Sequence, residues 1–327
     1  MKRYLPLFII LLSTACTEQG VKMNLREQMS TVDITIDNEG RQPELLYTAN
    51  ISSKNTYCGS DINYMKQLNN LGTSSGSFMS GFNASAFLKQ GHNKLELWVA
   101  SLDAYEGESL HREGAWCEVK LFASFSNGEQ QEMSSVTITE EKGIPTAKTS
   151  KIYPSIHQTP LETLEEETNG KVAMFRRSIY IKTIPRWRWV DATPFDETNR
   201  EHMKKLYRAY DNLLEMMRQR DFEGLAMAWS LSNREKAKAE AYYTSPEAFF
   251  NAVGFESTFE RYGDDGKVKP RQEWYDYQLK SFMGGRLFRL EDKRSQSPLR
   301  IGSVKKDWFF TVTPYFSLID GRVVVSR

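Results

Sequence analysis

Apolar and polar residues alternate along several short segments in the first half of the chain. Residues 32–36 show this period of two, and it recurs over residues 95–99, 117–125 and 136–138. Strict alternation places every second side chain on one face of a strand, so each segment is predicted to be a half-buried β-strand. Several such strands, separated by Gly and Asn turns, predict an antiparallel β-sandwich domain over residues 31–140.

The second half follows a different pattern. A strand is predicted over residues 172–184, and apolar residues then recur at three- and four-residue spacing over residues 206–217. That spacing predicts a helix of about 20 residues. Three shorter helices follow, the last beginning near Pro246, and alternation returns over residues 287–325. Helices followed by long antiparallel strands predict an α+β domain over residues 171–327, with the helices packed on an antiparallel sheet.

Two segments lack both patterns. Residues 65–81 are rich in Asn, Gly and Ser and are predicted to form a long loop. Residues 141–170 contain three prolines, few large apolar residues and the acidic run at 165–167, so they are predicted to be a linker. A chain of this length exceeds one comfortable core, which also favours two domains.

The chain begins with an export pattern. Two basic residues precede an apolar run over residues 5–12, three small residues and then Cys16. That order is typical of a secretory signal peptide, and the run is too short to cross a bilayer. The cysteine directly after the small residues makes the segment resemble the lipobox of bacterial lipoproteins, with Ser13 where that family usually has Leu. An ordinary secreted precursor is the alternative interpretation.

The resemblance to lipoproteins implies a location. Residues 1–15 would be removed, Cys16 would carry the lipid, and the polar residues 16–30 would tether it to the first folded element. Thr17 stands where lipoproteins retained in the inner membrane of enteric-type bacteria have Asp. The resemblance therefore implies a lipid-anchored protein of the bacterial outer membrane that faces the periplasm.

Two further cysteines remain once Cys16 is set aside. Cys58 and Cys117 form an even pair in an oxidising compartment, so a disulfide between them is predicted. If Cys117 points inward from its strand, this bond would staple the sandwich core. Two buried free thiols are the alternative, because cysteine packs well as a small apolar residue.

Charge and motif spacing narrow the candidate functions. The chain has a net charge of +1, which becomes −1 without residues 1–15, because that segment holds Lys2, Arg3 and no acidic residue. A near-neutral chain without a lysine-rich stripe gives no case for a nucleic-acid partner. The four histidines are scattered, so neither a metal nor a cofactor is predicted. Residues 72–76 match G-x-S-x-G, but their polar flanks predict a loop, and no catalytic residue is assigned.

The order of elements in the second half resembles the nuclear-transport-factor-like fold, in which a curved sheet wraps a long helix to form a cone. In such a cone, aromatic side chains could line a pocket for a small apolar ligand; equally, they could fill the cone as core. The candidate pocket residues are Trp229, Tyr242, Phe249, Phe250, Trp274, Trp308 and Tyr315.

A second candidate site is the Arg/Trp alternation at Arg186, Trp187, Arg188 and Trp189. On a strand, both tryptophans would lie on one face and both arginines on the other. Exposed, this strip would suit recognition of a protein, because Trp and Arg dominate interface hot spots. Buried beneath a helix, it would be ordinary packing.

These patterns predict a non-catalytic envelope lipoprotein that binds a protein partner in the periplasm. One form of this hypothesis is an immunity-type protein, which neutralises a toxin at the membrane. The first alternative is a module that binds a small apolar ligand or a lipid in the C-terminal cone. The second alternative is a hydrolase or isomerase, since cone folds can host acid–base chemistry.

Overall fold

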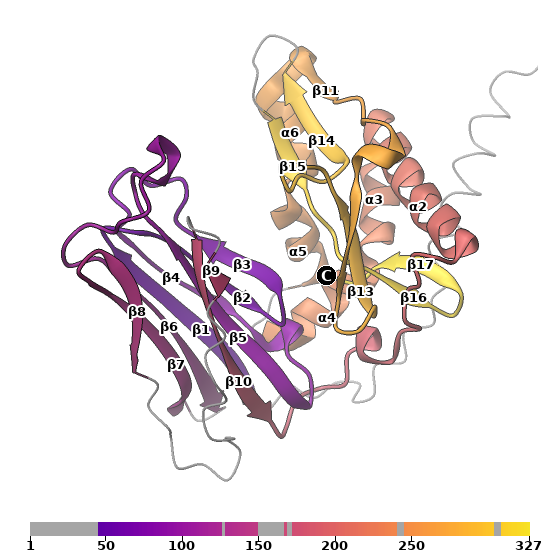
Figure 1. The fold of residues 1–327 in the computed structure, drawn as a ribbon. Helices are drawn as coiled ribbons and strands as arrows, with labels where there is room; N and C mark the ends of the chain where they lie inside the picture. The colour runs from indigo at the N-terminus through magenta and orange to yellow at the C-terminus, as the bar shows by residue number, and fades with distance from the viewer. Residues whose placement is uncertain (1–44, 126–127, 150–166, 169–171, 241–244, 304–308) are drawn as a thin grey trace, which may run out of the picture.

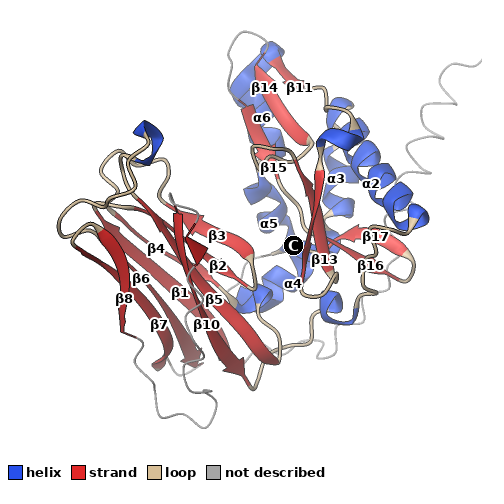
Figure 2. Ribbon diagram, viewed as in Figure 1, coloured by secondary structure: helices blue, strands red, loops and turns tan. Residues whose placement is uncertain are grey.

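The computed structural model describes residues 45–125, 128–149, 167–168, 172–240, 245–303 and 309–327. The expected signal peptide, tether and first strand, and most of the expected linker, lie outside these residues. The described chain has a strand-rich N-terminal region and a C-terminal region of helices and sheets, and its sheets are antiparallel (Figures 1 and 2). The mixed class expected from the sequence is therefore confirmed.

The N-terminal region contains two five-stranded sheets. The first sheet has the order β4-β1-β6-β7-β8, and the second has the order β3-β2-β5-β10-β9. The strands of the first sheet are β1 (Leu45–Lys54), β4 (Phe78–Asn83), β6 (Trp116–Phe125), β7 (Gln130–Glu141) and β8 (Ile144–Thr149). Those of the second are β2 (Tyr57–Ile62), β3 (Met65–Asn69), β5 (Gly91–Ala100), β9 (Glu167–Thr168) and β10 (Val172–Ile181).

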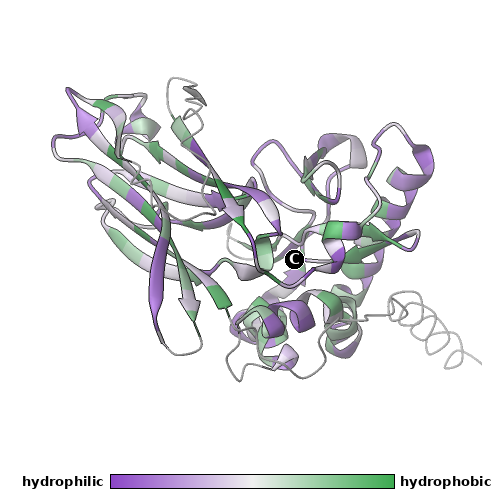
Figure 3. Cartoon of the chain, turned by 90° about the horizontal axis from the view of Figure 1, so that it is seen from below, coloured by the Kyte–Doolittle hydropathy of each residue, from purple (hydrophilic) through white to green (hydrophobic). Residues whose placement is uncertain are grey.

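One hydrophobic cluster receives side chains from both sheets, so their inner faces share a core. Leu95, Leu97 and Val99 of β5 enter it together with Val119 and Leu121 of β6. This is the period of two that the sequence shows, and it is visible as green and purple bands along the strands in Figure 3. Such alternation buries one face of each sheet and leaves the other face for water or a partner.

The predicted disulfide is confirmed. Cys58 of β2 bonds Cys117 of β6, with 6.4 Å between their Cα atoms, and both side chains are fully buried. The bond therefore links the second sheet to the first through their shared core.

Three expectations for this region are wrong. Residues 144–149 and 167–168, which were expected to belong to a linker, form β8 and β9 and pair in the two sheets. Residues 65–81 are not one long loop, because they contain β3 and most of β4, whose polar composition hides the strand pattern. The strand predicted over residues 172–184 was assigned to the second domain, yet β10 pairs along its whole length with β5 (Figure 1). Phe175 and Ile179 of β10 join the N-terminal core, which is the physical reason for this placement.

The C-terminal region begins with the short helix η3 (Arg188–Asp191). Its α-helices are α2 (Arg200–Arg218), α3 (Phe222–Ala228), α4 (Ser230–Glu240), α5 (Pro246–Val253) and α6 (Phe255–Tyr262). The order β11-β14-β15 makes a three-stranded sheet of Gly266–Val268, Leu299–Ser303 and Phe309–Val312. The order β12-β13-β16-β17 makes a four-stranded sheet of Gln278–Phe282, Leu287–Glu291, Phe316–Ile319 and Arg322–Val325.

These two sheets differ from the single curved sheet that was expected. Pro314 lies in the break between β15 and β16, and a proline cannot donate to a strand ladder. The long helix α2 does pack its apolar face into the C-terminal core, as its spacing predicts. There the Tyr210 and Phe316 rings lie 4.9 Å apart, and the Tyr210 hydroxyl accepts a 3.0 Å hydrogen bond from the Leu290 amide.

The two regions meet at a separate buried cluster, termed the junction cluster. Hydrogen bonds cross the same contact: the Lys66 amide donates to the Tyr315 hydroxyl at 3.0 Å, and the Trp187 indole donates to the Ser85 carbonyl at 3.0 Å. The buried members of the junction cluster are Met65, Ala86, Trp187, Trp189, Ala239, Leu287 and Tyr315.

In the described part of the chain, no helix is long and apolar enough to cross a membrane.

Candidate binding groove

The Arg/Trp strip is not an exposed recognition surface. Residues 188–191 form the short helix η3 and not a strand, and Trp187 and Trp189 are 1% and 0% exposed in the junction cluster. Arg186 forms an ion pair with Asp191. Arg188 forms an ion pair with Asp320, with 3.0 Å between a guanidinium nitrogen and a carboxylate oxygen. The hypothesis of an exposed interface is therefore wrong for both tryptophans, because β3 and η1 (Ser85–Phe87) cover them.

The described members of the predicted aromatic pocket do not gather around one space. Trp229 packs edge to face on Phe255, and Phe250 packs on the same ring. Trp274 belongs to the same C-terminal core, where it stacks on the Tyr207 ring at 4.7 Å. Tyr315 lies in the junction cluster, and Phe249 is half-buried on α5; Tyr242 and Trp308 lie outside the described residues. The alternative of core packing fits these positions.

A groove with a volume of about 630 Å³ lies instead on the outer face of the second sheet. We term it the Trp98 groove. Its lining comes mainly from β2, β3, β5 and β10, with the short helix η2 (Ala104–Glu106) at one side. Most of the lining is apolar, and it includes Tyr57, Leu68, Trp98, Tyr105, Val172 and Met174.

The strand registers explain why these side chains meet. Cys58 and Ile62 point from β2 into the core, so Tyr57, Gly59 and Asp61, which alternate with them, lie on the outer face. Pairing of β2 with β5, and of β5 with β10, then sets three rows across the outer face. The rows are Tyr57–Ala100–Val172, Gly59–Trp98–Met174 and Asp61–Glu96–Arg176.

A glycine makes the aromatic platform possible. Gly59 stands directly opposite Trp98, and the indole ring lies over it. A Cβ atom at position 59 would lie 2.3 Å from the Trp98 ring, which no real contact permits. The absence of a side chain therefore lets the indole lie across β2 and form a flat surface in the groove.

The rim of the groove carries exposed apolar side chains. Tyr105 is 80% exposed and meets the Tyr57 ring edge to face, with 5.8 Å between the ring centres. Leu71 is 46% exposed. Large apolar side chains exposed together around a concave site are typical of surfaces that bind a ligand or another protein.

Asp61 brings a carboxyl group into this apolar lining. Its side chain is only 8% exposed. Burial, and then the Glu96 carboxylate, raise the pKa of Asp61 to about 7. Lys66, Arg289 and Arg176 lower it, but by less in total. Asp61 therefore titrates near neutral pH, which is far above the range of an exposed aspartate.

The charged neighbours of this carboxyl group have other partners. Arg176 places its Nε atom 2.5 Å from a carboxylate oxygen of Glu96. The Lys66 ammonium lies 3.9 Å from the Glu291 carboxylate. Among the described residues, none makes a hydrogen bond or an ion pair with Asp61, although it faces the groove.

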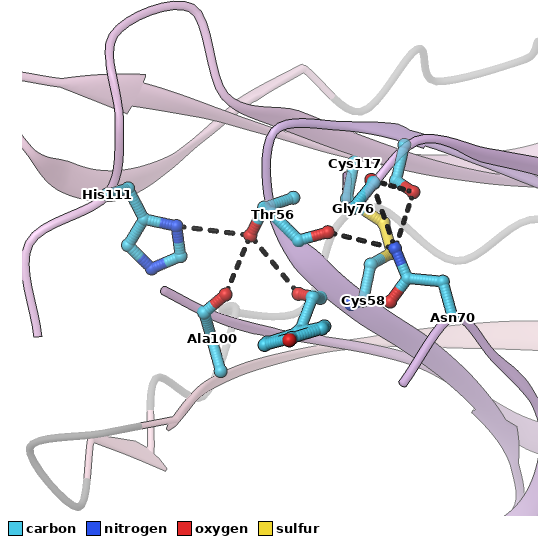
Figure 4. Close-up of a disulfide and its surroundings, with 9 residues drawn as sticks. Thr56, Cys58, Asn70, Gly76, Ala100, His111 and Cys117 are labelled. Carbon is cyan, nitrogen blue, oxygen red and sulfur yellow. Dashed lines mark hydrogen bonds between the residues drawn. A yellow bond between two sulfur atoms is a disulfide. The ribbon is translucent and has the colours of Figure 1, made fainter. Parts of the chain in front are cut away.

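The disulfide end of β2 is held by a polar network beside the groove (Figure 4). The Asn70 amide nitrogen donates to the Thr56 and Gly76 carbonyls at 2.9 and 3.1 Å, and its oxygen accepts from the Cys58 amide at 2.7 Å. Gly76 is the last glycine of the G-x-S-x-G match, and Ser74 is exposed on a bend without a following helix. This motif is therefore a packed turn, as its polar flanks predict.

Neither Asp61 nor Trp98 is among the candidate residues predicted from the sequence. One signal was present: Trp98 lies on the opposite face of its strand from Leu97 and Val99, so a large aromatic side chain points away from the core. Nothing comparable marks Asp61, because polar residues are common on outer faces. Among the described residues, no cluster of His, Cys, Asp or Glu could hold a metal ion.

Comparisons of this chain with family models, curated proteins and solved structures found no match.

Proposed function

We propose that this protein is a non-catalytic lipoprotein of the outer membrane that binds a protein partner in the periplasm through the Trp98 groove. In this proposal the N-terminal region is a β-sandwich domain that carries the binding site, and the C-terminal region is an α+β domain packed against it. The observation that supports the proposal most is the indole platform over Gly59, surrounded by the exposed side chains of Tyr105 and Leu71. Aromatic anchors in a concave site are typical of interface hot spots.

The disulfide supports an exported location. Bonds of this kind persist in oxidising compartments, which include the periplasm. Lipid attachment at Cys16 would hold the groove near the membrane, where an immunity-type protein would meet an incoming toxin. An immunity role is one form of the proposal, and any other periplasmic protein partner would use the same surface.

The lipid anchor has its own test. We expect the full-length protein to incorporate radiolabelled palmitate, and Cys16→Ser to abolish that labelling because the acylated thiol is gone. The label would be followed by autoradiography of envelope fractions, with Thr17→Ser as the matched control that keeps it. Labelling that survives in Cys16→Ser would contradict the anchor.

Site-specific photocrosslinking tests the groove. A benzoylphenylalanine placed at Leu71 is expected to give a discrete crosslinked species in living cells, because this position is at the groove rim. Met79 on β4 of the first sheet is 84% exposed and gives the matched control, which should not yield that species. Trp98→Ala should abolish the crosslink from position 71. Identical crosslinks from both positions would sink the proposal.

A small apolar ligand is the second candidate occupant. The groove volume of about 630 Å³ supports it, because small-molecule sites commonly measure about 300–1,000 Å³. The site would then be the Trp98 groove and not the C-terminal cone. Native mass spectrometry separates the two candidates: a small bound mass that Trp98→Ala removes would favour the ligand over the protein partner.

A further inference from the structure

We infer that the Trp98 groove recognises an arginine side chain of its protein partner, with the guanidinium bound by the Asp61 carboxylate and stacked on the Trp98 indole. This inference rests on the proposed function. It adds the chemistry that the partner must present: a cationic planar group next to an apolar side chain.

Asp61 is a buried carboxyl group without a direct partner. Asp61 is only 8% exposed in a mostly apolar groove, and no described residue gives its carboxyl group a hydrogen bond or an ion pair. Buried charges are ordinarily paired or hydrogen-bonded. The row that contains Asp61 also places the Glu96 carboxylate directly opposite it, and Arg176 is engaged with Glu96. Asp61 is therefore the carboxyl group that the described chain leaves without a direct ion pair in this row.

The protein already contains two sites at which a guanidinium group lies between a carboxylate and an aromatic ring. Arg176 pairs with the Glu96 carboxylate and lies over the Tyr64 ring, 5.3 Å from its centre. Arg289 pairs with the Glu291 carboxylate and lies 4.3 Å from the centre of the Tyr315 ring. Each is a carboxylate, a guanidinium and an aromatic ring held together.

The Trp98 groove holds the carboxylate and the ring but not the guanidinium. Asp61 and Trp98 are diagonal neighbours on adjacent strands, since Gly59 pairs with Trp98 two residues before Asp61. Diagonal positions on one face are about 7–8 Å apart, a gap that a side chain from a partner can bridge. The planar guanidinium suits this space because it can bind a carboxylate through two N–H groups and stack on an indole face.

Lys66 does not fill this role. It stands opposite Asp61 on β3 and lines the groove, but its ammonium is 3.9 Å from Glu291, and its side chain is 55% exposed. Its ammonium group therefore lies toward Glu291 on β13 of the C-terminal region. The groove keeps room for a second cation at Asp61.

A pair of peptides tests the inference. N-acetyl-Leu-Arg-Leu-amide and the same peptide with citrulline, which has the shape of arginine without its charge, would be titrated into the full-length protein and followed by NMR. At pH 8 the arginine peptide should bind about tenfold or more tightly than the citrulline peptide, since a hydrogen bond to a charged group supplies that difference. Asp61→Asn should reduce the ratio to about one.

Two controls keep the result interpretable. Asp264→Asn changes an exposed carboxylate on the short helix η4 (Gly263–Asp265), which does not line the groove, and should preserve the ratio. Trp98→Ala should weaken both peptides together. Equal binding of both peptides to the unmodified protein would overturn the arginine inference and leave the groove as an apolar binding site. No binding of either peptide would also overturn it, while the photocrosslink from position 71 would still decide the proposed function.

Discussion

Asp61→Asn is expected to stabilise the protein by up to about 4 kcal/mol at pH 9 and to leave its stability nearly unchanged at pH 4. The pKa of Asp61 is raised from 3.8 to about 7 in the folded protein, chiefly by burial. Below the unfolded value the group is neutral in both states. Between the unfolded value and about pH 7, the unfolded chain ionises while the folded protein keeps this carboxyl group protonated, so the wild type loses stability over that range and the loss is complete above it. The asparagine does not titrate and keeps its stability.

Urea unfolding at pH 4, 6 and 9 measures this effect in the wild type and in Asp61→Asn. The groups that face Asp61 are Glu96 on β5, Lys66 on β3, Arg176 on β10 and Arg289 on β13. Asp264→Asn controls for the change of net charge alone. An equal effect of Asp61→Asn at all three pH values would contradict the prediction, and so would a loss of stability at pH 9.

The stability of Asp61→Asn would also inform the role of Asp61 in binding at the Trp98 groove. A group that lowers the stability of the folded protein at neutral pH, in a groove with aromatic walls, fits the common conflict between stability and binding. If Asp61→Asn is more stable and also loses the preference for the arginine peptide, both observations have one physical origin.

Removing the disulfide is expected to lower the free energy of unfolding by about 4 kcal/mol in the chain-entropy model, given the 59-residue separation between Cys58 and Cys117. The double variant Cys58→Ala/Cys117→Ala removes the bond without adding a buried hydroxyl. Unfolding in urea would be measured with and without dithiothreitol. The reductant should bring the wild type close to the double variant and should not change the double variant. The prediction would be contradicted if the free energy of unfolding were the same for the oxidised wild type, the reduced wild type and the double variant.

Local patterns predicted much of the secondary structure. The alternation over residues 95–99 and 117–125 predicts β5 and β6, and the spacing over residues 206–217 predicts α2, because each pattern records which face of one element meets the core. The disulfide followed from the cysteine count and the expected compartment. These features depend on short stretches of chain or on simple chemistry.

The groove depends on information that no short stretch contains. It requires β10 to lie beside β5, although about seventy residues of chain separate them, and it requires Gly59 to stand opposite Trp98. The Arg/Trp alternation shows the converse problem. Alternation alone does not distinguish a strand from the short helix η3, and only the tertiary packing of the junction cluster explains why both tryptophans are buried.

The hydroxyl of Tyr315 has a consequence for how the protein avoids self-association. β3 is one of the two edge strands of the second sheet, and its Lys66 amide donates to that hydroxyl. Unsatisfied edge amides recruit strands from other molecules. The C-terminal region therefore covers part of this edge. In a fragment without the C-terminal region, the Lys66 amide of β3 would be exposed to pairing with strands of other molecules, which leads to aggregation.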